Sequence, residues 1–184
     1  MILDVARQEI SEHGIDGVSI RSIARRVGVD PKLVRHYYGS REQLLREAVQ
    51  VDMDPGKLAE RLLHGSRRRL GRHIATVLLE HWDSPRTMVP YRARLSASLT
   101  DQKVAEAMHD DFVAAFFGRL ATEVSPDQPE LRASLAASQV IGLAVSRYLV
   151  EEPTLVACSR EELIRMLGRT IQHYLTADLA PAAA

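Results

Sequence analysis

The feature that constrains this chain most is a short break between two helical patterns near its N-terminus. The break reads Gly-Val-Asp-Pro at residues 28–31, where the glycine ends one helix and the aspartate and proline start the next. Ser19 is a suitable N-cap for the first of these helices, and the second is predicted to run to about Tyr38. Two short helices joined by a tight turn are typical of a helix-turn-helix motif that binds DNA.

Positive charge is concentrated around the same break. Between Arg21 and Arg41 there are six Lys or Arg residues against one Asp, whereas the whole chain has 24 basic and 24 acidic residues. A chain with a formal net charge of zero has no overall attraction to nucleic acid, so any DNA affinity must come from this local cluster. A solvated helix face is the alternative explanation, and the surrounding helix-turn-helix pattern favours DNA over it.

A specific order of residues runs through this segment, made of a capped helix with its turn and then an aromatic helix end followed by the start of another helix. The residues that carry it are Ser19, Ile23, Ala24, Gly28 and Val29, then His36-Tyr37-Tyr38, Ser40-Arg41-Glu42 and Leu44. This order resembles the DNA-binding region of the TetR family of bacterial repressors. Many members carry a small residue and a tyrosine where this chain has Lys32 and Arg35, so base preference cannot be transferred from them.

The second helix of the motif is the predicted recognition helix. Such a helix presents its N-terminal and outward side chains to the major groove, where Lys and Arg donate to guanine and apolar groups touch the thymine methyl. The predicted base readers are Pro31, Lys32, Leu33, Arg35 and His36. The resemblance further implies that Arg21 reaches a base or a phosphate, and that phosphates are contacted by Ser19, Tyr37 and Arg41.

Other arginines have alternative assignments. Arg25 and Arg26 face outward on the first helix of the motif, and both DNA contact and a solvated surface stay open for them. A second basic run, Arg67-Arg68-Arg69 with Arg72, opens a later helical pattern. A solvated face is favoured there, with DNA contact or a bridge between domains as the alternatives.

The break Asp54-Pro55-Gly56 is the predicted domain boundary. Residues 1–52 are predicted to form a helix-turn-helix domain with a connecting helix, and residues 53–184 a larger helical effector-binding and dimerisation domain. No strand-like alternation follows the boundary, only helical patterns at residues 57–64, 67–82, 86–98, 101–123, 130–151 and 160–176. We therefore predict an all-α fold with about nine to ten helices in total.

A group of aromatic, Met and His residues in the second domain is a candidate ligand site. Their helical spacing more often indicates a protein core than a binding pocket. The resemblance, however, implies that these segments surround a pocket for a small apolar or amphipathic effector. The predicted pocket residues are His81, Trp82, Met88, Tyr91, Met108, Phe112 and Phe116.

The last two long helical patterns carry more apolar surface than one bundle face needs to bury, and small residues among them permit close packing. The resemblance implies that this pair forms a four-helix bundle with a second copy of the chain. The predicted interface residues are Leu135, Ile141, Val145, Tyr148, Leu149, Leu163, Leu167, Ile171 and Tyr174.

The sequence has few residues spaced for catalysis or metal binding. None of the seven histidines forms a His-x-x-x-His pair, and Glu106 with His109 makes the one Glu-x-x-His step. We therefore expect no metal, no cofactor and no enzymatic activity. The single cysteine, Cys158, cannot form an intrachain disulfide, and the N-terminus lacks a basic and then apolar leader, so a cytoplasmic protein is expected.

Together these features favour a transcriptional repressor that binds a palindromic operator as a homodimer and is released by a small molecule. Two alternatives stay open. One is a helical enzyme or ligand carrier whose N-terminal helices are scaffold, and the other is an adaptor that binds another protein through residues 130–176.

Overall fold

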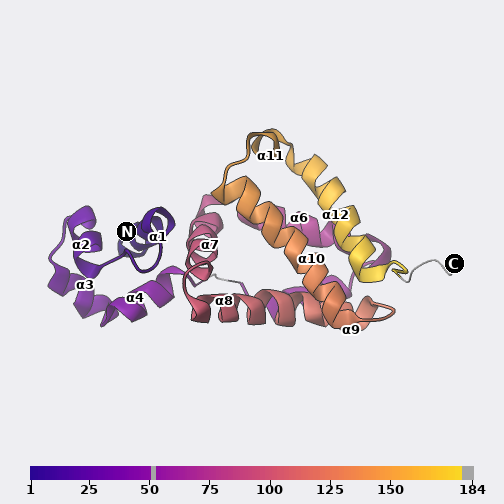
Figure 1. The fold of residues 1–184 in the computed structure, drawn as a ribbon, viewed down its shortest axis with the longest axis horizontal. Helices are drawn as coiled ribbons and strands as arrows, with labels where there is room; N and C mark the ends of the chain where they lie inside the picture. The colour runs from indigo at the N-terminus through magenta and orange to yellow at the C-terminus, as the bar shows by residue number, and fades with distance from the viewer. Residues whose placement is uncertain (51–52, 180–184) are drawn as a thin grey trace. The chain divides into compact units, whose positions relative to one another are not determined.

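The computed structural model describes residues 1–50 and 53–179, with the side chains of residues 85 and 86 left aside. All regular structure in these ranges is helical, which confirms the all-α prediction (Figure 1). No helix among the described residues combines the length and the apolar composition that crossing a bilayer requires.

The α-helices follow one another along the chain with short connections. Their bounds are α1 Ile2–His13, α2 Ile20–Val27, α3 Pro31–Tyr38, α4 Arg41–Ala48, α5 Pro55–Leu63, α6 Leu70–Trp82, α7 Pro85–Ser98, α8 Gln102–Met108, α9 Arg119–Val124, α10 Pro129–Ala144, α11 Pro153–Ala157 and α12 Arg160–Thr176. The short helix α11 is one that the sequence patterns did not predict.

Three predicted helices are less regular than their patterns suggested. A 3₁₀ turn, Arg67–Arg69, precedes α6, and π-helical stretches occupy His109–Gly118 and Val145–Leu149. The predicted helix 101–123 therefore contains α8, a π-helical middle and α9.

The chain divides into two compact units. One contains α1 to α4 with α7 and α8, and the other contains α5, α6, the π-helical stretches and α9 to α12. One division falls at residue 52, and residues 82–108 group with the N-terminal helices. The predicted domains, residues 1–52 and 53–184, stay a prediction.

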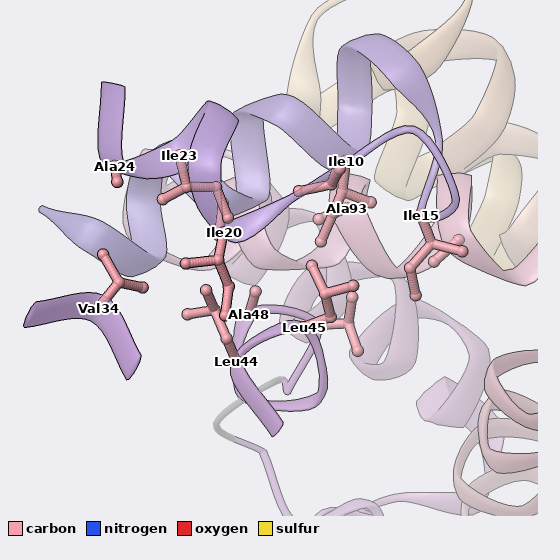
Figure 2. Packing of buried hydrophobic residues seen from close by; sticks show 14 residues of the cluster. Ile10, Ile15, Ile20, Ile23, Ala24, Val34, Leu44, Leu45, Ala48 and Ala93 are labelled. Atoms are coloured by element: carbon pink, nitrogen blue, oxygen red, sulfur yellow. The ribbon is translucent and has the colours of Figure 1, made fainter. Parts of the chain in front are cut away.

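The first unit is held by a core of small and branched apolar side chains. Ala6 and Ile10 of α1 are fully buried together with Ile23, Val34 and Leu44 from the next three helices. Figure 2 shows this cluster gathered between the helices, with Ala93 contributed by α7. Burial of a branched side chain stabilises by about 1.5–3 kcal/mol, so this core fixes the mutual orientation of α2 and α3.

The start and stop signals predicted for the short helices are confirmed. The side chains of Ser19, Asp30 and Ser40 each accept a hydrogen bond from a backbone N–H in the first turn of the following helix. Gly28 ends α2 with φ +79°, a left-handed conformation that favours glycine, and its N–H donates to the Ala24 carbonyl. The turn between α2 and α3 is therefore specified by local chemistry.

The second unit contains a buried arginine that links two helix ends. Arg132 of α10 is 1% exposed, and its guanidinium donates to the backbone oxygens of Tyr174 and Ala177 at 2.8 Å each. Its Nε also donates to Asp127 at 2.7 Å. A cation among the free carbonyls of a helix C-terminus is favourable, so Arg132 fixes the start of α10 to the end of α12.

Candidate nucleic-acid interface

Helix α3 contributes almost nothing to the core beyond one side chain. Val34 is fully buried, whereas Lys32, Leu33, Arg35, His36 and Tyr37 are exposed. Pro31 and Tyr38 are partly buried. The predicted base readers therefore share an accessible helix surface, as direct contact with major-groove base edges requires.

The start of α3 is fixed by two adjacent residues. The Asp30 carboxylate accepts from the Lys32 N–H at 2.7 Å, and Pro31 occupies the first turn, where its missing N–H costs nothing. Gly39 ends the helix with φ +70°. The N-terminal residues of α3 are thus held in a defined helical conformation on the solvent side.

Three further predicted DNA contacts are exposed. They are Ser19 and Tyr37, predicted to contact phosphates, and Arg21, predicted to contact a base or a phosphate. Ser19 is also a structural residue, because its Oγ accepts from the Ser22 N–H at 3.0 Å. Tyr37 is 68% exposed and its ring meets the His36 ring edge-on at 5.5 Å between centroids. An exposed aromatic hydroxyl at a helix end is suited to donate to a phosphate.

Arg41 differs from the other predicted contacts because its guanidinium already binds backbone oxygens. Its Nε donates to Val18 at 2.7 Å, and one terminal nitrogen donates to Ile15 at 2.6 Å. These bonds attach the start of α4 to the connection between α1 and α2. Its role at a phosphate stays a prediction, beside this structural role that sequence reasoning did not identify.

Arg26, whose role was left open, forms ion pairs with two glutamates of α1. Its guanidinium lies 3.0 Å from Glu9 and 2.8 Å from Glu12. Burial raises the pKa of Glu9, but hydrogen bonds from Arg26 and Ser22 and the Arg26 charge outweigh it, so the net pKa lies below its ordinary value. The hydrogen bond from Arg26 likewise lowers the pKa of Glu12, and both glutamates raise that of Arg26. Arg25 is exposed.

The predicted effector residues fall in both units. Trp82, Met88, Tyr91 and Met108 belong to the first unit, and His81, Phe112 and Phe116 belong to the second. In the second, Phe112 stacks on Phe116 with 5.8 Å between centroids, and both rings contact Phe117 edge-on. All three phenylalanines are buried, as a core cluster requires.

The pair Trp82 and Tyr91 is the most distinctive feature among those residues. The rings stack with 5.4 Å between centroids and a 30° interplanar angle, and Tyr91 is 5% exposed. Its hydroxyl is buried and makes no hydrogen bond within the part of the chain that the structure describes. Burial raises the pKa of Tyr91, since the charged form is the one that loses hydration.

The predicted dimer residues divide by burial within the single chain. Leu163, Leu167 and Ile171 of α12 are buried against the chain's own helices, so they serve its core. The others are partly exposed: Leu135, Ile141, Val145, Tyr148, Leu149 and Tyr174. Two further large apolar residues, Leu131 and Met166, are 52% and 55% exposed on the same two helices.

The described residues contain no group of three or more His, Cys, Asp and Glu side chains placed to hold a metal ion. Cys158 is half-buried with its Sγ 3.6 Å from a Glu162 oxygen. Burial and the negative charge of Glu162 raise the pKa of this thiol, which disfavours the reactive thiolate.

Two family models match the chain. The family described as bacterial regulatory proteins, tetR family, matches residues 2–48. The family described as tetracyclin repressor-like, C-terminal domain, matches residues 69–175. Between them they cover the helix-turn-helix and most of the helices that follow it.

Curated relatives and solved structures agree with these matches. The HTH-type transcriptional regulator BetI of Rhizobium meliloti strain 1021 is 25% identical over 170 residues, covering 86% of this chain and 81% of the relative. BetI of Agrobacterium fabrum strain C58 is 41% identical over 49 residues, or 27% of this chain and 24% of the relative.

Among solved structures, a TetR-family regulator from Streptomyces coelicolor A3 is 28% identical with a TM-score of 0.56, covering 95% of this chain and 92% of that one. A transcriptional regulator from Saccharomonospora viridis in complex with choline is 19% identical with a TM-score of 0.59, covering 94% of each chain. The second likeness, at this identity, concerns the fold.

Proposed function

This chain belongs to the TetR family of bacterial regulatory proteins, and from that membership we propose that it is a repressor that binds a palindromic operator as a homodimer and leaves it when a small molecule binds. The observation that carries the proposal is α3, which has one buried residue, Val34, and an exposed surface that carries Lys32, Arg35 and His36. We place its action in the cytoplasm, where the bacterial chromosome lies.

Lys32, Arg35 and His36 are the proposed base readers, with Pro31 and Leu33 available to thymine methyl groups. Ser19, Arg21, Tyr37 and Arg41 are the proposed residues that set the register on the phosphate backbone. The bonds from Arg41 to Val18 and Ile15 support a mainly positioning role for Arg41. Arg26 is left out of the set, because it is paired with Glu9 and Glu12.

The exposed apolar residues of α10 and α12 support the homodimer. Leu131 and Met166 are large hydrophobic side chains with about half of their surface exposed in the single chain. A two-fold dimer places its two recognition helices about 34 Å apart, which is one turn of B-DNA, and therefore requires a palindromic operator.

The stacked pair Trp82 and Tyr91 supports a small-molecule effector with an organic cation. Aromatic faces attract quaternary ammonium groups, and the buried Tyr91 hydroxyl can accept or donate one more hydrogen bond. The choline complex of the Saccharomonospora viridis regulator makes choline the first compound to test. To release DNA, the effector must bind the DNA-free conformation more tightly than the DNA-bound one.

The test of DNA recognition is fluorescence anisotropy with a duplex from the region upstream of the protein's own gene. Arg35→Ala is expected to weaken binding by roughly 1–3 kcal/mol for each half-site, as loss of a bidentate guanine contact does. Arg61→Ala is the matched control, since Arg61 is exposed on α5 in the other unit. The logarithm of the affinity should fall linearly with the logarithm of the salt concentration.

Equal affinities for the Arg35 and Arg61 variants would remove Arg35 from the interface. Absence of any duplex binding, or an affinity that does not fall with salt, would instead favour the helical enzyme, carrier or adaptor. Addition of choline to the preformed complex tests the effector separately, with NaCl at the same ionic strength as the control.

A further inference from the structure

The second unit has a cavity of about 600 Å³ between the start of α6 and α12. Arginine side chains dominate its lining: Arg68, Arg69 and Arg72 from the first side and Arg165 and Arg169 from α12. The sequence favoured a solvated face for the first group, and it gave no sign that the α12 arginines lie opposite. The cavity is called the arginine groove below.

Among the residues that the structure describes, no Asp or Glu lines the arginine groove. Within the described residues Arg68, Arg69, Arg72 and Arg169 form no ion pair, and Arg165 has one, to the half-exposed Glu162 at 3.4 Å. Some arginines elsewhere in the chain are paired, as Arg26 is with Glu9 and Glu12 and Arg132 is with Asp127. Like charges gathered without counter-charges repel one another, so a bound anion would lower the electrostatic energy of the groove.

The two sides of the groove are held together at a close helix crossing (Figure 1). A Cβ added to Gly71 of α6 would overlap the Gly168 carbonyl oxygen, so the two backbones lie in direct contact. Gln172 reinforces the crossing, because its Oε1 accepts from the Gly71 N–H at 2.9 Å and its Nε2 donates to the Arg67 carbonyl at 3.0 Å. The arginines are therefore anchored on a fixed backbone frame.

We propose that the arginine groove binds a small molecule that carries several phosphate groups. Guanidinium groups bind phosphate oxygens bidentately, and five exposed arginines line an open cavity whose volume is within the range of small-ligand sites. A DNA backbone is the less suitable occupant, since duplex phosphates lie on a convex cylinder, whereas these arginines line a cavity from two sides. This site is separate from the Trp82 and Tyr91 pair, which belongs to the other unit.

The experiment uses inorganic tripolyphosphate as the probe, with isothermal titration calorimetry and thermal unfolding of the full chain at constant ionic strength. The unaltered protein and the control Arg61→Gln are expected to bind with equal affinity and to gain thermal stability. The double variant Arg72→Gln, Arg169→Gln is expected to bind at least about tenfold more weakly, because two charged donors are removed. Arg169→Gln alone serves if the double variant does not fold.

Absence of saturable binding, or equal binding by the groove variants and Arg61→Gln, would overturn the proposal. A random 12-base-pair duplex is titrated in parallel. If the groove variants lose duplex affinity while tripolyphosphate does not bind, the groove is a nucleic-acid surface and the proposal is wrong. The measurement needs no operator, so its outcome is independent of the proposed repressor function.

Discussion

Arg26 shows at the residue scale how a basic side chain beside a recognition helix can serve the fold. Its charge counts toward the basic cluster in the sequence, yet in the structure it is neutralised by Glu9 and Glu12. The two glutamates lie three residues apart and so share a face of α1, but sequence spacing cannot indicate which arginine of another helix faces them.

Glu9→Gln tests this ion pair. The variant is expected to lower the free energy of unfolding by about 1 kcal/mol at pH 7, because a charged hydrogen bond to a mostly buried carboxylate is lost. Since the folded-state pKa of Glu9 lies below its ordinary value of 4.5, its stabilisation is present above pH 4.5 and is lost as the pH falls through the folded-state pKa.

The measurement is urea unfolding of the unaltered protein and Glu9→Gln at several pH values. Glu123→Gln, an exposed change on α9, is the control and should match the unaltered protein throughout. A stability difference for Glu9→Gln that stays constant down to pH 3 would show that the carboxylate charge is not its cause.

Tyr91→Phe is the second test at this scale. Because the Tyr91 hydroxyl is buried without a hydrogen bond in the described structure, its removal should leave stability unchanged or raise it by about 1 kcal/mol. The raised pKa means that the unfolded state releases its proton first, so Tyr91 costs stability as the pH rises above its ordinary value of 10.0. Thermal unfolding at pH 7 and pH 10.5 should show that Tyr91→Phe escapes this loss.

Tyr37→Phe is the matched control, because Tyr37 is 68% exposed. Marked destabilisation by Tyr91→Phe at pH 7, with Tyr37→Phe unaffected, would mean that the Tyr91 hydroxyl has a stabilising partner. If choline is the effector, Tyr91→Phe should also bind it more weakly.

The elements of the first unit were predictable because their signals are local. Caps at Ser19, Asp30 and Ser40 and the left-handed Gly28 act within one helical turn of the residue that carries them. The contacts of the second unit join residues far apart in the chain. Nothing near Arg132 in the sequence indicates that its charge is buried at the end of α12.

Gly71→Ala tests the crossing of α6 and α12. The added methyl would meet backbone atoms of Gly168 and Gln172, which cannot rotate away, so we expect destabilisation of about 1–3 kcal/mol. Gly142→Ala on α10 has no atom within 4 Å of the added methyl and should be neutral or slightly stabilising. Chemical unfolding at equal protein concentration compares the two. Equal stabilities would show that the crossing is loosely packed.

The whole molecule depends on a second copy of the chain if the proposed repressor function is right. The sequence assigned both buried and exposed residues of α12 to the interface, because periodicity cannot separate a helix face that packs inside the chain from one that packs outside it. Leu163, Leu167 and Ile171 face the chain's own core, whereas Leu131 and Met166 are accessible.

The double variant Leu131→Glu, Met166→Glu tests this assignment. Charged side chains at a buried apolar contact should shift the sedimentation coefficient from that of a dimer to that of a monomer. Operator affinity should fall with it, because two half-sites are no longer bound by one particle. Val156→Glu on α11, where the parent residue is 50% exposed, is the control. A double variant that stays dimeric would place the interface elsewhere.

The burial pattern of α3 has a consequence for how such a regulator can diverge. Val34 and the partly buried Tyr38 connect this helix to the core, while Lys32, Arg35 and His36, which are proposed to read bases, are exposed. A gene duplicate could therefore exchange Lys32, Arg35 or His36 and acquire a new target with little loss of stability. Substitutions on this exposed surface can therefore change operator specificity without changing the fold that presents it.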